Sequence, residues 1–247
     1  MIDYPTCKTY LSRAIAILQT IMEEDAAALE QAARTIAASL SAGGTVYSFG
    51  TGHAHLLAEE IFYRAGGLAA ACPMLDERLM LHVSASGSTD WERKPGVAAE
   101  VLARYPVKPG DTVIIISQSG RNTAPVEMAR LARERGAAVI ALTNLAHSKS
   151  VTARNPWNLR LFEAADITLD LHGAIGDAAI AMPSGLNVAP TSTVAGAAIL
   201  QALVCRVRAL TEEAGQPADC YMSSNVDGGD AFNAQLIERY RSTNPHL

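Results

Sequence analysis

The spacing of apolar positions changes after the first forty residues. Over residues 6–41, leucine, isoleucine and methionine recur every three or four positions, which predicts one long helix or two consecutive helices. Gly43 and Gly44 end this segment. It belongs to no strand–helix unit, so its apolar face must pack on a neighbour, for which a second subunit is a candidate.

Beyond residue 44, short apolar blocks alternate with helical patterns. The expected strands are residues 45–49, 68–72, 112–116, 138–142 and 166–171. The expected later helices are residues 54–65, 97–105, 192–210 and 230–240, with another after the third strand. The block 112–116 is β-branched without polar alternation, which is typical of a parallel strand covered on both faces.

This alternation predicts an α/β fold with a doubly wound, five-stranded parallel sheet in one domain. We divide the chain into an N-terminal helical extension (1–42), a main domain (43–215) and a C-terminal tail with a helix (216–247). The tail is a candidate for wrapping a partner subunit.

Composition narrows the classes of function. The chain has 247 residues, of which 49% are hydrophobic and 18% charged, as expected for a compact soluble protein. A net charge of −5 gives no electrostatic reason to expect nucleic acid, so a small ligand is favoured. Four widely spaced cysteines predict free thiols in a reducing cytoplasm. The uncharged run 178–205 contains Pro183 and Pro190, so we expect no membrane span there.

A polar loop follows the central strand and precedes a helix. It reads Ser117-Gln-Ser-Gly-Arg-Asn122. The carboxyl ends of parallel strands are where open α/β sheets bind ligands, and a helix N-terminus favours anions. The loop therefore predicts a phosphate site. In the alternative interpretation, Ser117 and Ser119 only close a turn, and Asn122 or Thr123 caps the helix.

A second polar loop, Gly50-Thr-Gly-His53, follows the first strand. It lacks the third glycine of the dinucleotide-binding pattern and has no acidic residue at the required distance, which argues against a dinucleotide.

Three segments together resemble the sugar isomerase (SIS) domain family. They are residues 49–60 (Phe-Gly-Thr-Gly-His-Ala-His-Leu-Leu-Ala-Glu-Glu), residues 110–122 and residues 190–193 (Pro-Thr-Ser-Thr). The likeness to a stand-alone bacterial phosphosugar isomerase subgroup covers most of the chain. It includes Phe62-Tyr-Arg-Ala-Gly-Gly67 and Asn225-Val-Asp-Gly-Gly-Asp230.

The resemblance implies a flavodoxin-like SIS fold, a homodimer or homotetramer with sites near subunit boundaries, and a phosphorylated sugar held by the polar loops. Matched residue by residue, the implied binding residues are Gly50, Thr51 and Gly52 on the sugar side, Ser117, Ser119, Gly120, Arg121 and Asn122 around the phosphate, and Thr191, Ser192 and Thr193 at the late helix. For the last group, capping of the helix by Thr191 or Ser192 is the alternative.

Two adjacent glutamates are candidates for catalysis. Aldose–ketose isomerisation needs a base that moves a proton between adjacent carbons, and a second group for the hydroxyl proton. His55 and Glu59 share a helix face, whereas Glu60 points about 100° away from Glu59. The resemblance to phosphoheptose isomerases makes Glu60 the closer match, so both stay open. Arg64 could pair with Glu60 or with a ligand phosphate.

The resemblance also implies a histidine on the late helix, which this chain lacks. The substitutes are His53, His55, His82 and His246, and for the last two a surface or capping role is the alternative. His53, His55 and Glu59 could instead bind a metal, although we expect no cofactor.

The resemblance implies three alternative functions. The first is an isomerase acting on a sugar phosphate through an enediol. The others are a non-catalytic phosphosugar sensor and an etherase-type lyase acting on an amino-sugar phosphate. The triplet Asp76-Glu77-Arg78 after the second strand either forms a solvated turn or contacts sugar hydroxyls.

Overall fold

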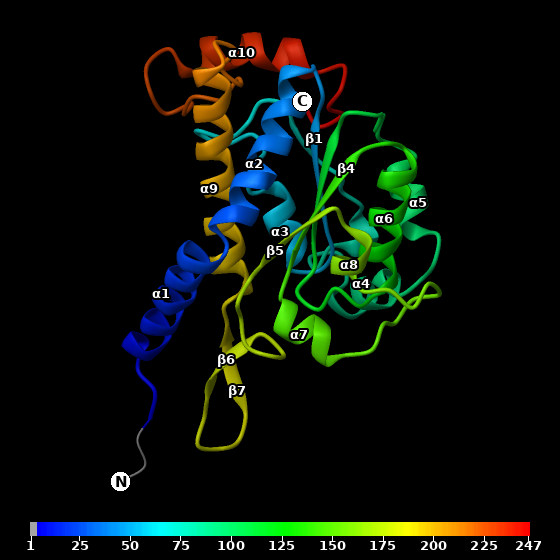
Figure 1. The fold of residues 1–247 in the computed structure, drawn as a ribbon, viewed down its shortest axis with the longest axis vertical. Coiled ribbons are helices and arrows are strands. Elements are labelled where there is room, and N and C mark those ends of the chain that lie inside the picture. The colour runs from blue at the N-terminus through cyan, green and yellow to red at the C-terminus, as the bar shows by residue number, and fades with distance from the viewer. Residues whose placement is uncertain (1–3) are drawn as a thin grey trace.

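The computed structural model describes residues 4–247, and its centre is a five-stranded sheet (Figure 1). The strands are β1 (Val46–Gly50), β2 (Ala71–Pro73), β3 (Thr112–Ile116), β4 (Ala138–Thr143) and β5 (Ile167–Asp170). All neighbouring pairs are parallel, in the order β2-β1-β3-β4-β5, which is the flavodoxin-like order. The predicted α/β fold with a five-stranded parallel sheet is confirmed.

The register brings three strand ends level with one another. Gly50 pairs with Ile116, and Ile116 pairs with Leu142. Because the strands are parallel, the loops that follow β1, β3 and β4 emerge at the same edge of the sheet.

Helices cover both faces of the sheet, and β3 alternates between them. Ile114 and Ile116 face a core shared with α2 (Ala26–Ser41), α3 (Ala54–Glu59) and α9 (Ser192–Glu213). Val113 and Ile115 face a second core, shared with α5 (Val97–Leu102), α6 (Thr123–Glu134) and α8 (Leu161–Ala164). A strand buried on both faces explains the absence of polar alternation.

The N-terminal segment forms two helices, α1 (Cys7–Glu24) and α2. The helix is interrupted at Asp25, whose φ of −102° lies outside the usual helical range and whose carboxylate lies 2.8 Å from Nε2 of His172. α2 packs along α9, whereas α1 extends away from the sheet (Figure 1). Leu11, Ile15 and Met22 on α1 are 59%, 56% and 67% exposed.

The uncharged run 178–205 ends within a long helix, α9. By length and composition alone, the 22 residues of α9 could cross a membrane. However, Leu200, Leu203 and Val207 are buried against the domain, and a core helix of a folded protein passes the same test.

Several predicted bounds and connections were wrong. The helix expected over residues 54–65 ends at Glu59, and β2 starts at Ala71 rather than Leu68, which forms an isolated bridge with Cys220. The sequence analysis missed the antiparallel hairpin of β6 (Ala178–Ala181) and β7 (Asn187–Pro190), which projects from the body in Figure 1. It also missed four short helices, namely η1 (Glu77–Leu79), α4 (Ala85–Glu92), α7 (Leu145–Ser150) and α8.

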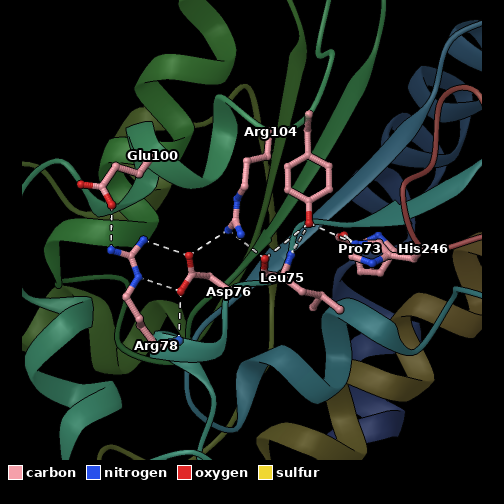
Figure 2. Close-up of polar contacts among 8 residues, drawn as sticks. Pro73, Leu75, Asp76, Arg78, Glu100, Arg104 and His246 are labelled. Atoms are coloured by element: carbon pink, nitrogen blue, oxygen red, sulfur yellow. Dashed lines mark hydrogen bonds and ion pairs between the residues drawn. The ribbon is translucent and has the colours of Figure 1, made fainter.

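The C-terminal residues return to the chain's own sheet after α10 (Gly229–Tyr240). Nδ2 of Asn244 donates a hydrogen bond to the Ala71 carbonyl at 3.0 Å. Nε2 of His246 lies 2.9 Å from the Pro73 carbonyl oxygen and 3.0 Å from the hydroxyl of Tyr105 (Figure 2).

Next to this contact, Asp76 and Arg78 of the charge triplet after β2 take part in a partly buried ion-pair network (Figure 2). The Asp76 carboxylate is bound by Arg78 at 2.9 Å and by Arg104 at 2.8 Å, and Arg78 also binds Glu100 at 2.7 Å. The triplet is therefore neither a fully solvated turn nor a wall of the cleft described below.

Candidate functional site

A cleft of about 340 Å³ opens where the loops after β1 and β3 meet. Among its lining residues, those that the sequence predicted are Thr51, Gly52, His53, Ser117, Ser119, Asn122, Ser192 and Thr193. The other lining side chains with polar groups are Ser88, Thr89, Glu92, Gln118, His147 and Asp177. This edge of the sheet is where ligands bind in open α/β folds.

The loop after β3 is held in a tight turn. Oγ of Ser117 accepts a hydrogen bond from the Gly120 backbone N–H at 3.2 Å, so this serine closes the turn while it also lines the cleft. Gly120 has a φ of +58°, and an added Cβ would lie 3.0 Å from both Ser148 Oγ and Thr143 Oγ1. Only glycine fits this position without strain.

The helix that follows begins without a side-chain cap. Asn122 is the N-cap residue of α6, and its side chain makes no capping hydrogen bond. Both side-chain polar atoms of Gln118 and Oδ1 of Asn122 are buried and have no hydrogen-bond partner within the described part of the chain. Buried polar groups are almost always paired, so these atoms together indicate a place for a polar ligand.

The loop after β1 is shaped by close backbone approach. A Cβ on Gly50 would lie 2.3 Å from the Ala54 carbonyl oxygen, and Gly52 has a φ of +55°. Thr51 and Gly52 line the cleft, together with the exposed His53. Gly50 itself does not line it, and serves to let α3 start close to the strand.

The N-terminus of α9 is occupied by a carboxylate of the same chain, that of Asp177. One oxygen of Asp177 accepts hydrogen bonds from the backbone N–H groups of Thr191 and Ser192 at 3.2 and 3.0 Å. The other oxygen accepts one from the Ser192 hydroxyl at 2.5 Å. Asp177, rather than Thr191 or Ser192, therefore caps this helix.

The two candidate glutamates lie outside the cleft lining. Glu60 binds Arg64, as the spacing of four residues predicted, and accepts a hydrogen bond from Gln201 at 3.0 Å. The side chain of Glu59 is 45% exposed and lies 4.0 Å from the ring of His55. His55 is buried, with Nδ1 against the Gly52 carbonyl oxygen.

The remaining predicted residues also lie away from the lining. Arg121 reaches the hydroxyl of Thr152 at 3.3 Å, and Thr191 is buried below the end of α9. His82 lies with its ring 6.4 Å from that of His55, and His246 contacts Pro73 and Tyr105. Within residues 4–247, no three His, Cys, Asp or Glu side chains are grouped so that they could hold a metal ion.

Sequence reasoning missed Glu92 at the end of α4. Burial raises the pKa of its carboxyl, and the side chains of Thr51 and Asn122, which interact with it, offset this effect only in part. No periodicity marked this residue, because α4 is short and rich in serine and glycine.

His147 on α7 was missed as well. Its Nδ1 accepts a hydrogen bond from the Gly176 backbone N–H at 2.6 Å. Burial and the nearby Arg121 guanidinium lower the pKa of His147, and Asp177 opposes this only in part. The sequence did offer one signal for His147, because it lies three residues after Asn144, which directly follows β4.

Comparison with known proteins agrees with this architecture. A model of the SIS domain family matches residues 9–144, more than half of the chain. UPF0309 proteins of Brucella canis and of Brucella melitensis biotype 2 are each 44% identical over 239 residues, covering 96% of this chain and 97% of theirs.

Solved structures share the fold at low sequence identity. The phosphoheptose isomerase from Francisella tularensis has a TM-score of 0.54 and 19% identity, covering 81% of this chain and 95% of that one. The phosphoheptose isomerase from Neisseria gonorrhoeae has a TM-score of 0.51 and 20% identity, and the match again covers 81% of this chain and 95% of that one. The sugar isomerase domain of an RpiR transcription factor from Sphaerobacter thermophilus has a TM-score of 0.50 and 14% identity. This match covers 94% of this chain and 96% of that one.

The sheet order, the cleft at its carboxyl edge and the sequence matches lead to one assignment. The chain belongs to the SIS domain family and, within it, to the UPF0309 proteins.

Proposed function

We propose that the cleft binds a phosphorylated sugar and that the protein isomerises it by proton transfer through an enediol. The phosphate lies on the loop from Ser117 to Asn122, and the sugar extends toward Thr51 and Gly52. Hydroxyl groups, amides and backbone N–H groups are the donors that a phosphate accepts from.

One observation carries this proposal. Nε2 and Oε1 of Gln118 and Oδ1 of Asn122 are buried without a partner in the described part of the chain, and Asn122 is the N-cap residue of the uncapped helix α6. A sugar phosphate supplies both kinds of partner, because its hydroxyl groups can donate to the two amide oxygens and its phosphate oxygens can accept from Nε2 of Gln118. A phosphate also gains from the partial positive charge of the helix end.

The N-terminus of α6, rather than that of α9, is open to the phosphate. The predicted residues Thr191 and Ser192 already donate hydrogen bonds to the Asp177 carboxylate, which occupies the end of α9. Thr193, which is exposed and lines the cleft, remains free to contact sugar hydroxyls.

Known relatives of the fold support the class of ligand. Two of the solved structures above are phosphoheptose isomerases, and a third is the sugar isomerase domain of a transcription factor. Because their identity to this chain is 20% or less, they support the fold and make a phosphosugar the first ligand to test.

Calorimetry with matched ligands tests the binding step. Ribose 5-phosphate, glucose 6-phosphate, fructose 6-phosphate and sedoheptulose 7-phosphate are titrated beside the corresponding free sugars. We expect at least one phosphate to bind and its free sugar not to bind. Ser119→Ala should weaken that binding about 5- to 10-fold through loss of one hydrogen bond, whereas Ser224→Ala, on an exposed loop, should not. Equal affinity for the free sugars would refute the phosphate site.

A phosphosugar sensor without turnover is the second candidate. Its support is that Glu59 and Glu60 both lie outside the cleft lining. A ligand that binds but shows no exchange of its carbon-bound protons with solvent would decide for the sensor. Lyase chemistry of the etherase type remains an alternative for the same cleft, and release of a free acid from an amino-sugar phosphate would reveal it.

We further propose a homodimer or homotetramer in the cytoplasm. The exposed apolar side chains of α1 supply a surface for a second copy, and the four cysteines are all free thiols.

A further inference from the structure

Glu92 and His147 are brought to the same cleft from different parts of the chain. Glu92 ends α4 and interacts with Thr51 and Asn122, at the loops after β1 and β3. His147 lies on α7, which follows β4. Both side chains line the cleft, Glu92 beside Thr51 and Asn122, and His147 from the helix that follows β4.

The hydrogen bond to His147 fixes its proton. Nδ1 accepts the Gly176 N–H, so in the neutral ring the proton is on Nε2. The lowered pKa keeps the ring neutral near pH 7. His147 can therefore present an N–H donor to a substrate oxygen without carrying a charge.

Glu92 supplies the complementary group. Its carboxyl has a raised pKa because it is buried, so its carboxylate form is a stronger base than an exposed carboxylate. A buried carboxyl group and an imidazole with an oriented N–H line one cleft, and the surroundings shift the pKa of each, which makes them candidates for an acid–base pair.

We propose that Glu92 and His147 are the acid–base pair of this site, an inference that rests on the proposed sugar-phosphate cleft. Glu92 takes the proton from the carbon beside the carbonyl, while Nε2–H of His147 gives its proton to the carbonyl oxygen, which forms the enediol. Glu92 then returns its proton to the former carbonyl carbon. His147 recovers a proton from the neighbouring hydroxyl, which becomes the new carbonyl. No proton or electron is gained or lost overall.

This pair takes the place of the groups that the family resemblance implied. Glu60 is held by Arg64 and Gln201, and α9 has no histidine. Glu92 and His147 fill the same two chemical roles from other elements of the fold.

The test combines binding with proton exchange. Each sugar phosphate named above is incubated with wild-type protein in D₂O, and loss of its carbon-bound proton is followed by NMR. We expect Glu92→Gln and His147→Gln to bind the phosphate within about threefold of wild type, and to slow exchange about 10²- to 10⁴-fold and about 10²-fold, respectively. Glu92→Asp keeps the charge but shortens the side chain, so its exchange rate should fall less than that of Glu92→Gln.

Controls separate this inference from the proposed function. Glu77→Gln, an exposed glutamate away from the cleft, should exchange like wild type. Thermal melting shows that each variant is folded. If the wild type binds no sugar phosphate, the proposed function fails and the pair with it. If it binds but Glu60→Gln or Glu59→Gln stops exchange while Glu92→Gln does not, or if the wild type exchanges no proton, the pair is refuted and the binding site stands.

Discussion

Gly120 is the most constrained residue of the proposed phosphate loop. Its backbone is left-handed, and Ser148 and Thr143 crowd the space that a side chain would need. The carbonyl oxygen of the same residue accepts a hydrogen bond from Leu161 N–H at 2.7 Å, which ties the loop to α8. The loop is therefore shaped before a ligand arrives.

Gly120→Ala should destabilise the fold by about 2–3 kcal/mol, because strain of the left-handed backbone and contact with two hydroxyl groups add together. Urea denaturation measures this change. Gly215→Ala is the matched control, since its φ is +74° but nothing lies within 4 Å of an added Cβ. It should lose only about 1 kcal/mol. Equal losses would show that crowding at Gly120 is unimportant.

The environment of Glu92 predicts how activity depends on pH. A base must be ionised, so activity should fall as pH drops through the pKa of Glu92, which burial raises above its usual value of 4.5. Arg93 and Arg154 act in the opposite direction. Arg93→Gln should therefore move the acid midpoint of kcat/KM to higher pH. An unchanged or lower midpoint would contradict this assignment of the acid limb.

At the scale of elements, the segment after β2 is held by charge rather than by regular structure. Burial alone would raise the pKa of Asp76, but its hydrogen bonds with Arg78 and the charges of Arg78 and Arg104 outweigh this and hold the pKa below its usual value. This carboxylate ties the short helix η1 to Arg104, in the turn after α5 (Figure 2).

Asp76→Asn should cost about 2 kcal/mol of the free energy of unfolding at pH 7, because charge-assisted hydrogen bonds are lost. The pKa is lower in the folded state, so this stability is present above pH 4 and disappears as pH falls through the folded pKa. Denaturant titrations should show that the difference in the free energy of unfolding between variant and wild type is smaller near pH 3 than at pH 7. A difference that is the same at both values would mean that charge is not its source.

The sequence was most informative where one physical signal dominated. The β-branched block of β3 and the glycine loop after β1 were sufficient to place the sheet and one edge of the cleft. The end of helix α3 at Glu59 was missed because the apolar pattern continues through Ile61 and Phe62. In the structure the chain has already left the helix, and Tyr63 has a positive φ of 39°. The hairpin β6–β7 was missed because nearly all of its side chains are partly or fully exposed and its apolar and polar residues do not alternate.

The proposed acid–base pair shows why sites are harder to predict than folds. Glu92 and His147 lie 55 positions apart in the chain, and only the folded structure places both in the lining of one cleft. Their roles depend on burial and on single hydrogen bonds such as that from Gly176, and neither is visible in residue type or spacing.

At the scale of the whole molecule, α1 carries large apolar side chains that the rest of the chain leaves exposed. Ala14, Ile17 and Ile21 face the body, while Leu11, Ile15 and Met22 point outward. An amphipathic helix with apolar residues on its outer side is expected to pack on another copy.

The double variant Leu11→Glu, Ile15→Glu should convert the proposed oligomer to a monomer, because four new charges would be buried in the interface of each dimer. Light scattering after size exclusion gives the mass. Val226→Glu changes an equally exposed apolar residue near α10 and should leave the mass unchanged. A wild type that is already monomeric, or an oligomer that survives the double change, would rule out this interface.

The carboxylate of Asp177 also limits what the whole cleft can accept. The cleft offers the uncapped end of α6 to an anion, and it is also lined by the Asp177 carboxylate, which directly precedes β6. A second phosphate group that reached Asp177 would meet a like charge. The cleft should therefore discriminate monophosphates from bisphosphates.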